Sequence, residues 1–223
     1  MTVEIWSDVV CPFCYMGKRR FEHALKDFEH RDQVQVTWRS FQLDPSAHYV
    51  PGRSVYEYLA ESKGITLEAS RRAHDRLAAA AAELGLSYQF ETAVLANTFD
   101  AHRLTHLARA GGLQERMEER LFAAYFTEGR NIGEHQTLAE LAAEAGLDPA
   151  EAREMLAGSA FSDDVRSDER EAVELGADGV PFFVFDRSMS VAGAHPSELF
   201  LEVLRTVWEE HGAAAPAAPA VTP

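Results

Sequence analysis

Two cysteines, Cys11 and Cys14, are the only ones in a sequence of 223 residues, and both stand in the segment SDVVCPFCYMGKRRFE. A thiolate can attack a disulfide to form a mixed disulfide, which a second thiol within reach can then resolve. Pro12 follows the first cysteine, and proline favours the first turn of a helix, where its missing N–H has no partner anyway. The spacing therefore predicts a redox-active pair at a helix start, with Cys11 as nucleophile and Cys14 as the deeper, resolving thiol.

The residues around the pair suggest how its charge is controlled. Free amides and the positive end of the helix dipole would favour a thiolate at Cys11. Phe13 brings neither charge nor a hydrogen-bond donor, so the helix amides must hold the thiolate, and we expect a milder oxidant than a pair that encloses histidine. Asp8 is a candidate to exchange a proton with Cys14. A structural role in capping the loop is the more ordinary alternative for Asp8.

The same spacing has two other readings. A C-x-x-C pair is half of a zinc site, but the sequence has no second pair, and no histidines stand beside it at ligand spacing. A disulfide across two residues would constrain the unfolded chain very little. Redox chemistry is therefore favoured and no metal is predicted. A non-enzymatic metal-binding or redox-sensing module stays as an alternative.

The elements that must position the cysteines follow from the hydrophobic periodicity. Residues 2–9 and 33–41 have strand patterns with a helical repeat between them, and residues 54–176 are helical throughout. VPFFVFD and MSVAGA then read as a hairpin that turns at 186–188, before a last helix that begins at Pro196. We predict an α/β thioredoxin fold, with a mixed four-stranded sheet and a large all-helical insertion domain.

This reading divides the chain into four parts: an N-terminal half of the thioredoxin fold at 1–45, the helical insertion at 46–176, the C-terminal half at 177–211 and a flexible tail at 212–223. Within the insertion, three patterns predict helix starts. They are Ser54 with Glu57, Thr137 with Glu140, and Asp148 with Pro149 and Glu151.

Composition limits the partners and the compartment. A net charge of −15 disfavours binding to nucleic acid or to anionic membrane surfaces. Glu4 and Asp8 stand where a secretory signal would be basic and then apolar, and no segment is long and apolar enough to span a bilayer. We expect a cytoplasmic protein, monomeric or homodimeric, and in the cytosol disulfides are usually transient and catalytic.

A second motif, GVPFF, places Val180 and Pro181 at the start of a strand. Proline there is ordinarily a device of edge strands. Together with DVVCPFCYMGKRRFE, NTFDAHRL (97–104) and YFTEGRNIG (125–133), however, this motif resembles the DsbA-like branch of the thioredoxin superfamily, in particular FrnE-like cytoplasmic oxidoreductases. The resemblance implies a cis peptide before Pro181 packed against the cysteines, and a Val180 backbone free to pair with substrate. Pro12 and Phe13 would complete the substrate contacts under a roof of inserted helices.

The segment NTFDAHRL is open to two interpretations. Asn97 suits a helix cap and His102 an ordinary helix face, whereas the resemblance implies that this helix approaches the site. We therefore treat Asn97 and His102 as candidate supporting residues.

The function predicted is thiol-disulfide exchange on a protein or small-molecule thiol or disulfide. No cofactor is predicted, although a low-molecular-weight thiol can serve as co-substrate. The rival on the same fold is a glutathione-dependent enzyme, similar to 2-hydroxychromene-2-carboxylate isomerases or kappa-class transferases. Those relatives carry serine at the position of Cys11, and their chemistry would leave Cys14 unexplained.

Overall fold

The sheet of this protein has the predicted mixed topology. A computed structural model describes residues 1–211, so the tail predicted at 212–223 lies outside the described residues. The strands are β1 (Thr2–Ser7), β2 (Gln35–Ser40), β3 (Phe182–Phe185) and β4 (Met189–Ala192). Their order is β2-β1-β3-β4, with β1 and β2 parallel and the other two pairs antiparallel. The thioredoxin-type α/β fold is thereby confirmed.

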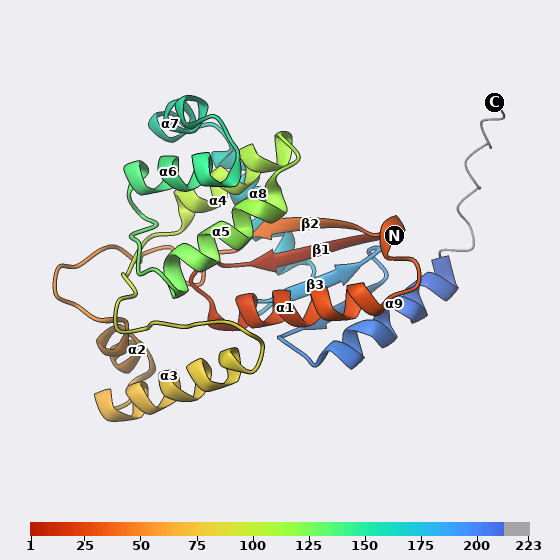
Figure 1. Ribbon diagram of the computed structural model, residues 1–223, viewed down its shortest axis with the longest axis horizontal. Coiled ribbons are helices and arrows are strands. Elements are labelled where there is room, and N and C mark those ends of the chain that lie inside the picture. Colours follow the sequence, from red (N-terminus) through yellow and green to blue (C-terminus); the bar gives the residue numbers. More distant parts are fainter. Residues whose placement is uncertain (212–223) are drawn as a thin grey trace.

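Helices make up most of the regular structure outside the sheet. They are α1 (Pro12–Asp27), the 3-10 turn η1 (Arg31–Gln33), α2 (Val55–Lys63), α3 (Leu67–Ala82), α4 (Phe99–Ala110), α5 (Gln114–Phe126), α6 (His135–Ala145), α7 (Pro149–Ala157), α8 (Ser162–Glu174) and α9 (Ser197–His211). Helices α2 to α8 all lie between β2 and β3 in the sequence. In Figure 1, α1 and α9 lie together along the sheet, α4 to α7 form a second group, and α2 and α3 stand apart from both.

Side chains that alternate along β1 enter two different cores. Val3 and Ile5 join Phe183 and Phe200 in the core beneath α1 and α9. Trp6 points to the opposite face, where it packs with residues of β3 and α8. Because both faces of β1 are covered, all its residues after the first are buried, as in the central strands of layered α/β folds.

Two of the three predicted helix starts are confirmed. The Ser54 hydroxyl accepts a hydrogen bond from the Glu57 amide, and the Glu57 carboxylate accepts one from the Ser54 amide, so the capping box begins α2. The Asp148 carboxylate accepts from the Ala150 amide at 2.8 Å and caps α7.

The third predicted helix start is wrong. Helix α6 begins at His135, two residues before Thr137, with Glu134 at the N-cap. The Glu134 amide donates to the Asn131 carbonyl, and the Asn131 side chain donates to the Glu134 carboxylate at 2.9 Å. This turn fixes where the chain enters the helix, so the local pattern at Thr137 has no capping role.

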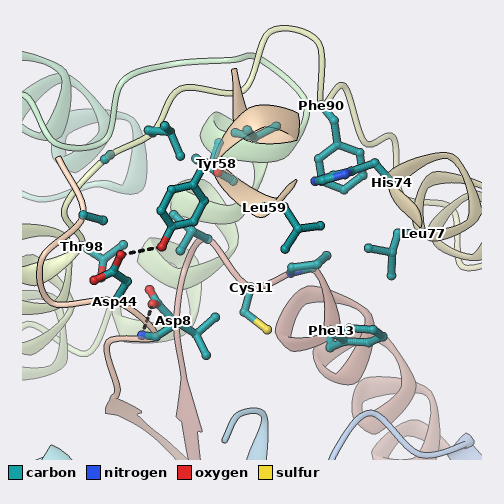
Figure 2. A pocket seen from close by; sticks show the side chains of 18 of the residues that line it. Asp8, Cys11, Phe13, Asp44, Tyr58, Leu59, His74, Leu77, Phe90 and Thr98 are labelled. Atoms are coloured by element: carbon teal, nitrogen blue, oxygen red, sulfur yellow. Dashed lines mark hydrogen bonds between the residues drawn. The ribbon is translucent and has the colours of Figure 1, made fainter. Parts of the chain in front are cut away.

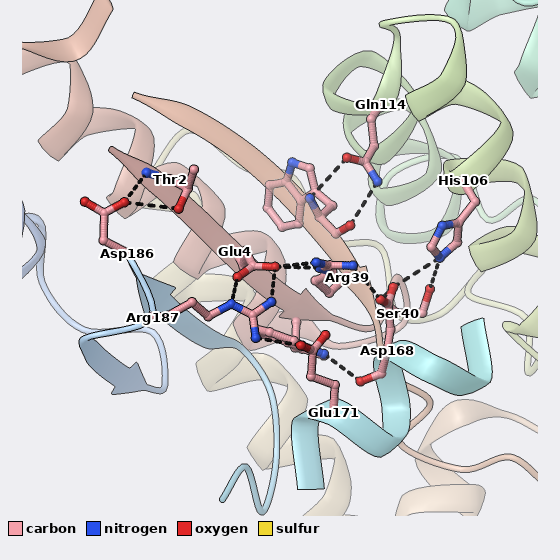
Figure 3. Close-up of polar contacts among 12 residues, drawn as sticks. Thr2, Glu4, Arg39, Ser40, His106, Gln114, Asp168, Glu171, Asp186 and Arg187 are labelled. Carbon is pink, nitrogen blue, oxygen red and sulfur yellow. Dashed lines mark hydrogen bonds and ion pairs between the residues drawn. The ribbon is translucent and has the colours of Figure 1, made fainter. Parts of the chain in front are cut away.

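A buried polar network joins α8 and the β3–β4 turn to the sheet (Figure 3). Glu4 of β1 pairs with Arg39 of β2 and with Arg187, and Arg39 also contacts Asp168 of α8 at 2.9 Å. His106 of α4 reaches the same Asp168 carboxylate at 3.1 Å. Side chains of β1, β2, α4, α8 and the β3–β4 turn are therefore held together by ion pairs and hydrogen bonds.

The outer edge of β2 is covered by side chains. The Gln114 amide group accepts from the Trp38 N–H at 3.1 Å and donates to the Trp38 carbonyl at 2.9 Å. Two residues along, the Ser40 N–H donates to Asp168 at 3.0 Å. Backbone groups that an edge strand usually leaves open are thus satisfied by α5 and α8.

Candidate active site

The cysteine pair lies where the sheet meets the inserted helices. Cys11 is the N-cap of α1 and Pro12 is its first residue, as the sequence predicts. The Cys11 N–H donates to the Asp8 carbonyl at 2.9 Å, which turns the chain from β1 into the helix. Both cysteines are free thiols. Cys11 is 3% exposed and Cys14 1%, so even Cys11 is reached only through a cavity rather than from an open surface.

The Val180–Pro181 corner faces Cys11. This peptide bond is cis, as the resemblance implies. The Cys11 Sγ lies 3.6 Å from the Val180 carbonyl oxygen, to which the thiol donates. Gly17, one turn beyond Cys14, faces the Pro181 ring, and a Cβ atom at Gly17 would stand only 3.0 Å from Pro181 Cγ. Helix α1 and the proline corner therefore pack closely, and Cys11 lies where this contact borders a cavity.

That cavity has a volume of about 690 Å³ and lies between Cys11 and the helices α2 and α3. Figure 2 shows Tyr58, Leu59 and Leu77 across from Cys11. Phe90 and the loop around Leu43 close the sides. Helices α2 and α3 thus form the roof that the resemblance implies, and the apolar lining is the main chemical character of the space.

A second cavity, of about 480 Å³, lies on the other side of Phe13. Pro181, Met16 and His195 line it, while Phe13, Leu77 and Val180 line both cavities. Phe13 is 49% exposed, which is unusual for a phenylalanine in this chain. It therefore stands on the boundary between two recesses that flank the cysteine pair.

Cys14 is held as a neutral thiol. Burial raises its pKa well above the usual value, and the neighbouring Cys11 raises it further. The Asp8 N–H and the Ser7 hydroxyl act in the opposite direction and would stabilise a thiolate at Cys14. Within the described chain the Ser7 hydroxyl has no hydrogen-bond partner, so it is available for that sulfur.

Behind the pair lies a buried group of acids with a histidine. Asp8 Oδ1 and His102 Nε2 are 3.4 Å apart, both side chains are 1% exposed, and the contact lacks the alignment of a hydrogen bond. Burial lowers the pKa of His102, but Asp8, with Glu118 and Glu169 nearby, outweighs burial and raises it. Burial also raises the pKa of Glu118 to about 7. Glu118 can therefore hold and release a proton near neutral pH.

The other candidate supporting residue, Asn97, has a structural position. Its amide donates to the Pro45 carbonyl at 2.8 Å, and its oxygen accepts from Gln42 and from the Phe99 N–H. The N-cap of α4 is Thr98, one residue after the predicted cap. Asn97 thereby connects two segments of the cavity wall. Its neighbour Thr98 lines the cavity.

Three contributors to the site escaped the sequence analysis: Ser7, Tyr58 and Glu118. Ser7 ends β1, and a serine there carries no distinguishing local signal. Glu118 reads as one more acid on an ordinary amphipathic helix, yet it is only 2% exposed. A carboxyl on the apolar face of α5 is the signal that could have drawn attention to it.

Two further observations concern metals and membranes. Between residues 1 and 211, no group of three or more histidine, cysteine or acidic side chains is placed to hold a metal ion. No helix of the described part has the length and hydropathy needed to cross a bilayer.

A C-x-x-C pair at the start of α1, opposite a cis-proline on a mixed four-stranded sheet, defines a thioredoxin-fold protein. The chain belongs to the family of DSBA-like thioredoxin domains, which it matches over residues 2–205. It is 30% identical over 200 residues to the uncharacterized protein YwbO of Bacillus subtilis, covering 89% of this chain and 92% of YwbO.

Solved structures agree with this assignment. A crystal structure described as a probable DsbA oxidoreductase from Streptomyces coelicolor is 44% identical, with a TM-score of 0.88 over 98% of this chain and 93% of the other. The cytosolic disulfide reductase DsbM from Pseudomonas aeruginosa, solved with GSH, has a TM-score of 0.65 at 21% identity, over 94% of this chain and 100% of DsbM. The second likeness concerns the fold alone.

Proposed function

We propose that this protein is a thiol-disulfide oxidoreductase in which Cys11 is the nucleophile and Cys14 the resolving thiol. One observation carries the proposal: Cys11 stands at the N-cap of α1, lines the cavity and lies 3.6 Å from the Val180 carbonyl, with Cys14 buried behind it. Membership of the DSBA-like family supports the same chemistry.

The reducing direction proceeds in two displacements. The Cys11 thiolate attacks one sulfur of the substrate disulfide, whose S–S bond breaks as the Cys11–substrate bond forms, and the first substrate thiolate leaves. Cys14 then loses its proton and attacks the Cys11 sulfur, which releases the second thiolate. The protein dithiol gives up two electrons and becomes a disulfide, and an external dithiol restores it. The oxidising direction is the reverse.

Substrate and proton handling follow from the placement of the neighbours. Val180, Pro181, Pro12 and Phe13 surround the reacting sulfur on its open side, so we assign them to substrate contact. Asp8 is the proposed proton acceptor for Cys14, because its buried carboxylate lines the same cavity as Cys11 and has one oxygen that no hydrogen bond occupies among the described residues.

The compartment in which this chemistry runs is also a proposal. DsbM, which shares the fold, is described as cytosolic and as a disulfide reductase. We extend the cytosolic compartment and the use of thiol or disulfide substrates to this chain, with no nucleic-acid partner in view of its acidity.

A redox titration tests the proposed function. The protein is equilibrated in graded thiol/disulfide buffers, quenched with acid and alkylated, and its free thiols are counted by mass spectrometry. We expect one cooperative two-electron transition in the wild type. Cys11→Ser should abolish disulfide exchange, whereas Cys14→Ser should accumulate the Cys11 mixed disulfide.

Two results would reject the proposal. Full exchange activity in Cys11→Ser would remove the nucleophile. A pair that never closes, together with a Cys11–glutathione adduct that Cys14 leaves intact, would favour the glutathione-dependent isomerase or transferase chemistry instead.

A further inference from the structure

The cavity above Cys11 has a composition that selects among disulfides. Its walls carry leucine, valine, alanine and aromatic side chains from α2, α3 and the following loop. Of its two carboxylates, Asp44 is engaged by the Tyr58 hydroxyl at 2.5 Å and by Ser46. Asp8 is buried at the inner end beside Cys11. Polar groups of a substrate that lie against these apolar walls would lose hydration without gaining partners.

Two cations complete the lining. Lys63 ends α2 and Arg76 lies on α3; both side chains are exposed and both line the cavity. Neither has a hydrogen bond or ion pair with another residue of the described chain, whereas Arg72, also on α3, pairs with Glu68. In a protein with a net charge of −15, unpaired cations on the wall of an apolar cavity complement an anionic group of a ligand.

The dimensions separate small ligands from polypeptides. A volume of about 690 Å³ lies within the range of roughly 300–1,000 Å³ of pockets that enclose small molecules. The neighbouring recess of about 480 Å³, beyond Phe13, can accept the other half of a disulfide whose sulfur–sulfur bond lies over Cys11. The two recesses match the two halves of one substrate.

We propose that the cavity binds one half of a small disulfide, formed from an aromatic or branched apolar thiol that carries a carboxylate directed at Lys63 and Arg76. The inference rests on the proposed oxidoreductase function and adds its substrate class. Cys11 attacks the sulfur of the enclosed half, the outer half leaves as a thiolate through the recess beyond Phe13, and Cys14 then releases the enclosed half. Both electrons come from the cysteine pair.

Single-turnover kinetics test this substrate class. Reduced protein is mixed with either 5,5′-dithiobis(2-nitrobenzoate), an aromatic disulfide with carboxylates, or 4,4′-dithiodipyridine, which has none. The released thiol is followed by absorbance. Replacing both cations (Lys63→Gln with Arg76→Gln) should lower the rate constant for the carboxylate probe roughly fivefold, the worth of two exposed ion pairs, and leave the dipyridine within twofold. Arg72→Gln is the matched control and should change neither rate.

A filling variant tests the enclosure. Leu59→Trp narrows the cavity and should slow both aromatic disulfides about tenfold or more, while alkylation of Cys11 by the much smaller iodoacetamide stays within twofold of wild type. Unchanged iodoacetamide reactivity shows that the variant is folded and its nucleophile intact.

The outcomes separate this inference from the function on which it rests. The substrate class is wrong if the double cation variant loses the same rate for both probes, or if Leu59→Trp reacts with both at the wild-type rate. Neither result contradicts a two-electron transition in the redox titration, so the oxidoreductase function would be retained. If Cys11 and Cys14 never form a disulfide in that titration, the oxidoreductase function fails, and the substrate class fails with it.

Discussion

Cys14, the proposed resolving thiol, would have to lose a proton in surroundings that favour its neutral form. Its pKa is raised by burial and by Cys11. The Ser7 hydroxyl and the Asp8 amide partly offset this effect, and the Asp8 carboxylate is the acid closest in sequence that the fold buries with the pair. His102 opposes Asp8 at 3.4 Å and holds a positive charge there when protonated.

Replacing the proton acceptor should slow one step and leave the other unchanged. We expect Asp8→Asn to slow the release of the mixed disulfide by Cys14 about a hundredfold, the usual worth of a positioned general base, and to leave attack by Cys11 within a few-fold. Rapid quenching with alkylation and mass spectrometry resolves the two steps. Asp44→Asn removes another carboxylate of the same cavity and should change neither; equal slowing in both variants would contradict the role of Asp8.

Some residues of this site could be predicted from the sequence and others could not. The cysteine pair was predictable because its chemistry is tied to residue type and to a local pattern, whereas the cis peptide before Pro181 was implied by the family resemblance. Glu118 and Ser7 were not, because their importance comes from burial beside groups that are distant in sequence. The contact of Arg39 with Asp168 spans 129 residues and leaves no local trace in either strand or helix.

Among the helices and strands, the contact that matters most for the site is the packing of α1 against the Val180–Pro181 corner before β3. Gly17 allows this approach, since a Cβ atom there would meet Pro181 Cγ at 3.0 Å and Phe183 Cζ at 3.5 Å. Alanine is ordinarily the better helix former by roughly 1 kcal/mol. At Gly17 this gain in helix stability is opposed by the Pro181 ring, which would have to move to make room for a Cβ atom.

Gly17→Ala therefore tests the packing of this corner. We expect the rate of disulfide reduction to fall about tenfold, because the Val180 carbonyl and Pro181 are displaced from Cys11, and the free energy of unfolding to show none of the usual gain. Gly111→Ala is the control, since its Cβ would meet only ordinary contacts at 3.7 Å at the end of α4. If Gly17→Ala is both more stable and fully active, the contact between Gly17 and Pro181 does not require a glycine.

The helical elements were predicted more completely than their arrangement. Apolar periodicity gave the presence of the inserted helices, and caps at Ser54 and Asp148 gave two of their starts. The periodicity could not show that α2 and α3 lie over Cys11 and leave a cavity. A helical repeat of leucine and alanine indicates that a face is buried, but it does not identify the element that packs against that face.

For the molecule as a whole, the buried acids make stability depend on pH. Glu118 is raised to a pKa of about 7 in the folded protein, against about 4.3 in an unfolded chain. The folded state therefore binds more protons between these values, and the free energy of unfolding falls as the pH rises through this window. Well above pH 7 the free energy of unfolding carries the full cost of burying the ionised Glu118 carboxylate.

Glu118→Gln should remove this pH-dependent loss. Relative to wild type, the free energy of unfolding should gain up to about 3 kcal/mol between about pH 4 and pH 8.5, as the difference of the two pKa values implies. Urea denaturation at both pH values measures it. Glu151→Gln removes the same charge from an exposed site on α7 and is the control for the loss of a carboxylate alone. A parallel result for Glu118→Gln would show that this carboxyl titrates normally.

The covered edge of β2 has a consequence for how copies of this protein meet. Gln114 and Asp168 occupy the outward backbone groups of Trp38 and Ser40, so an incoming strand would first have to break these bonds. Growth of the sheet into a neighbouring molecule is thereby blocked on this side. Pairing of two copies through β2 would therefore cost intramolecular hydrogen bonds before it formed any between the molecules.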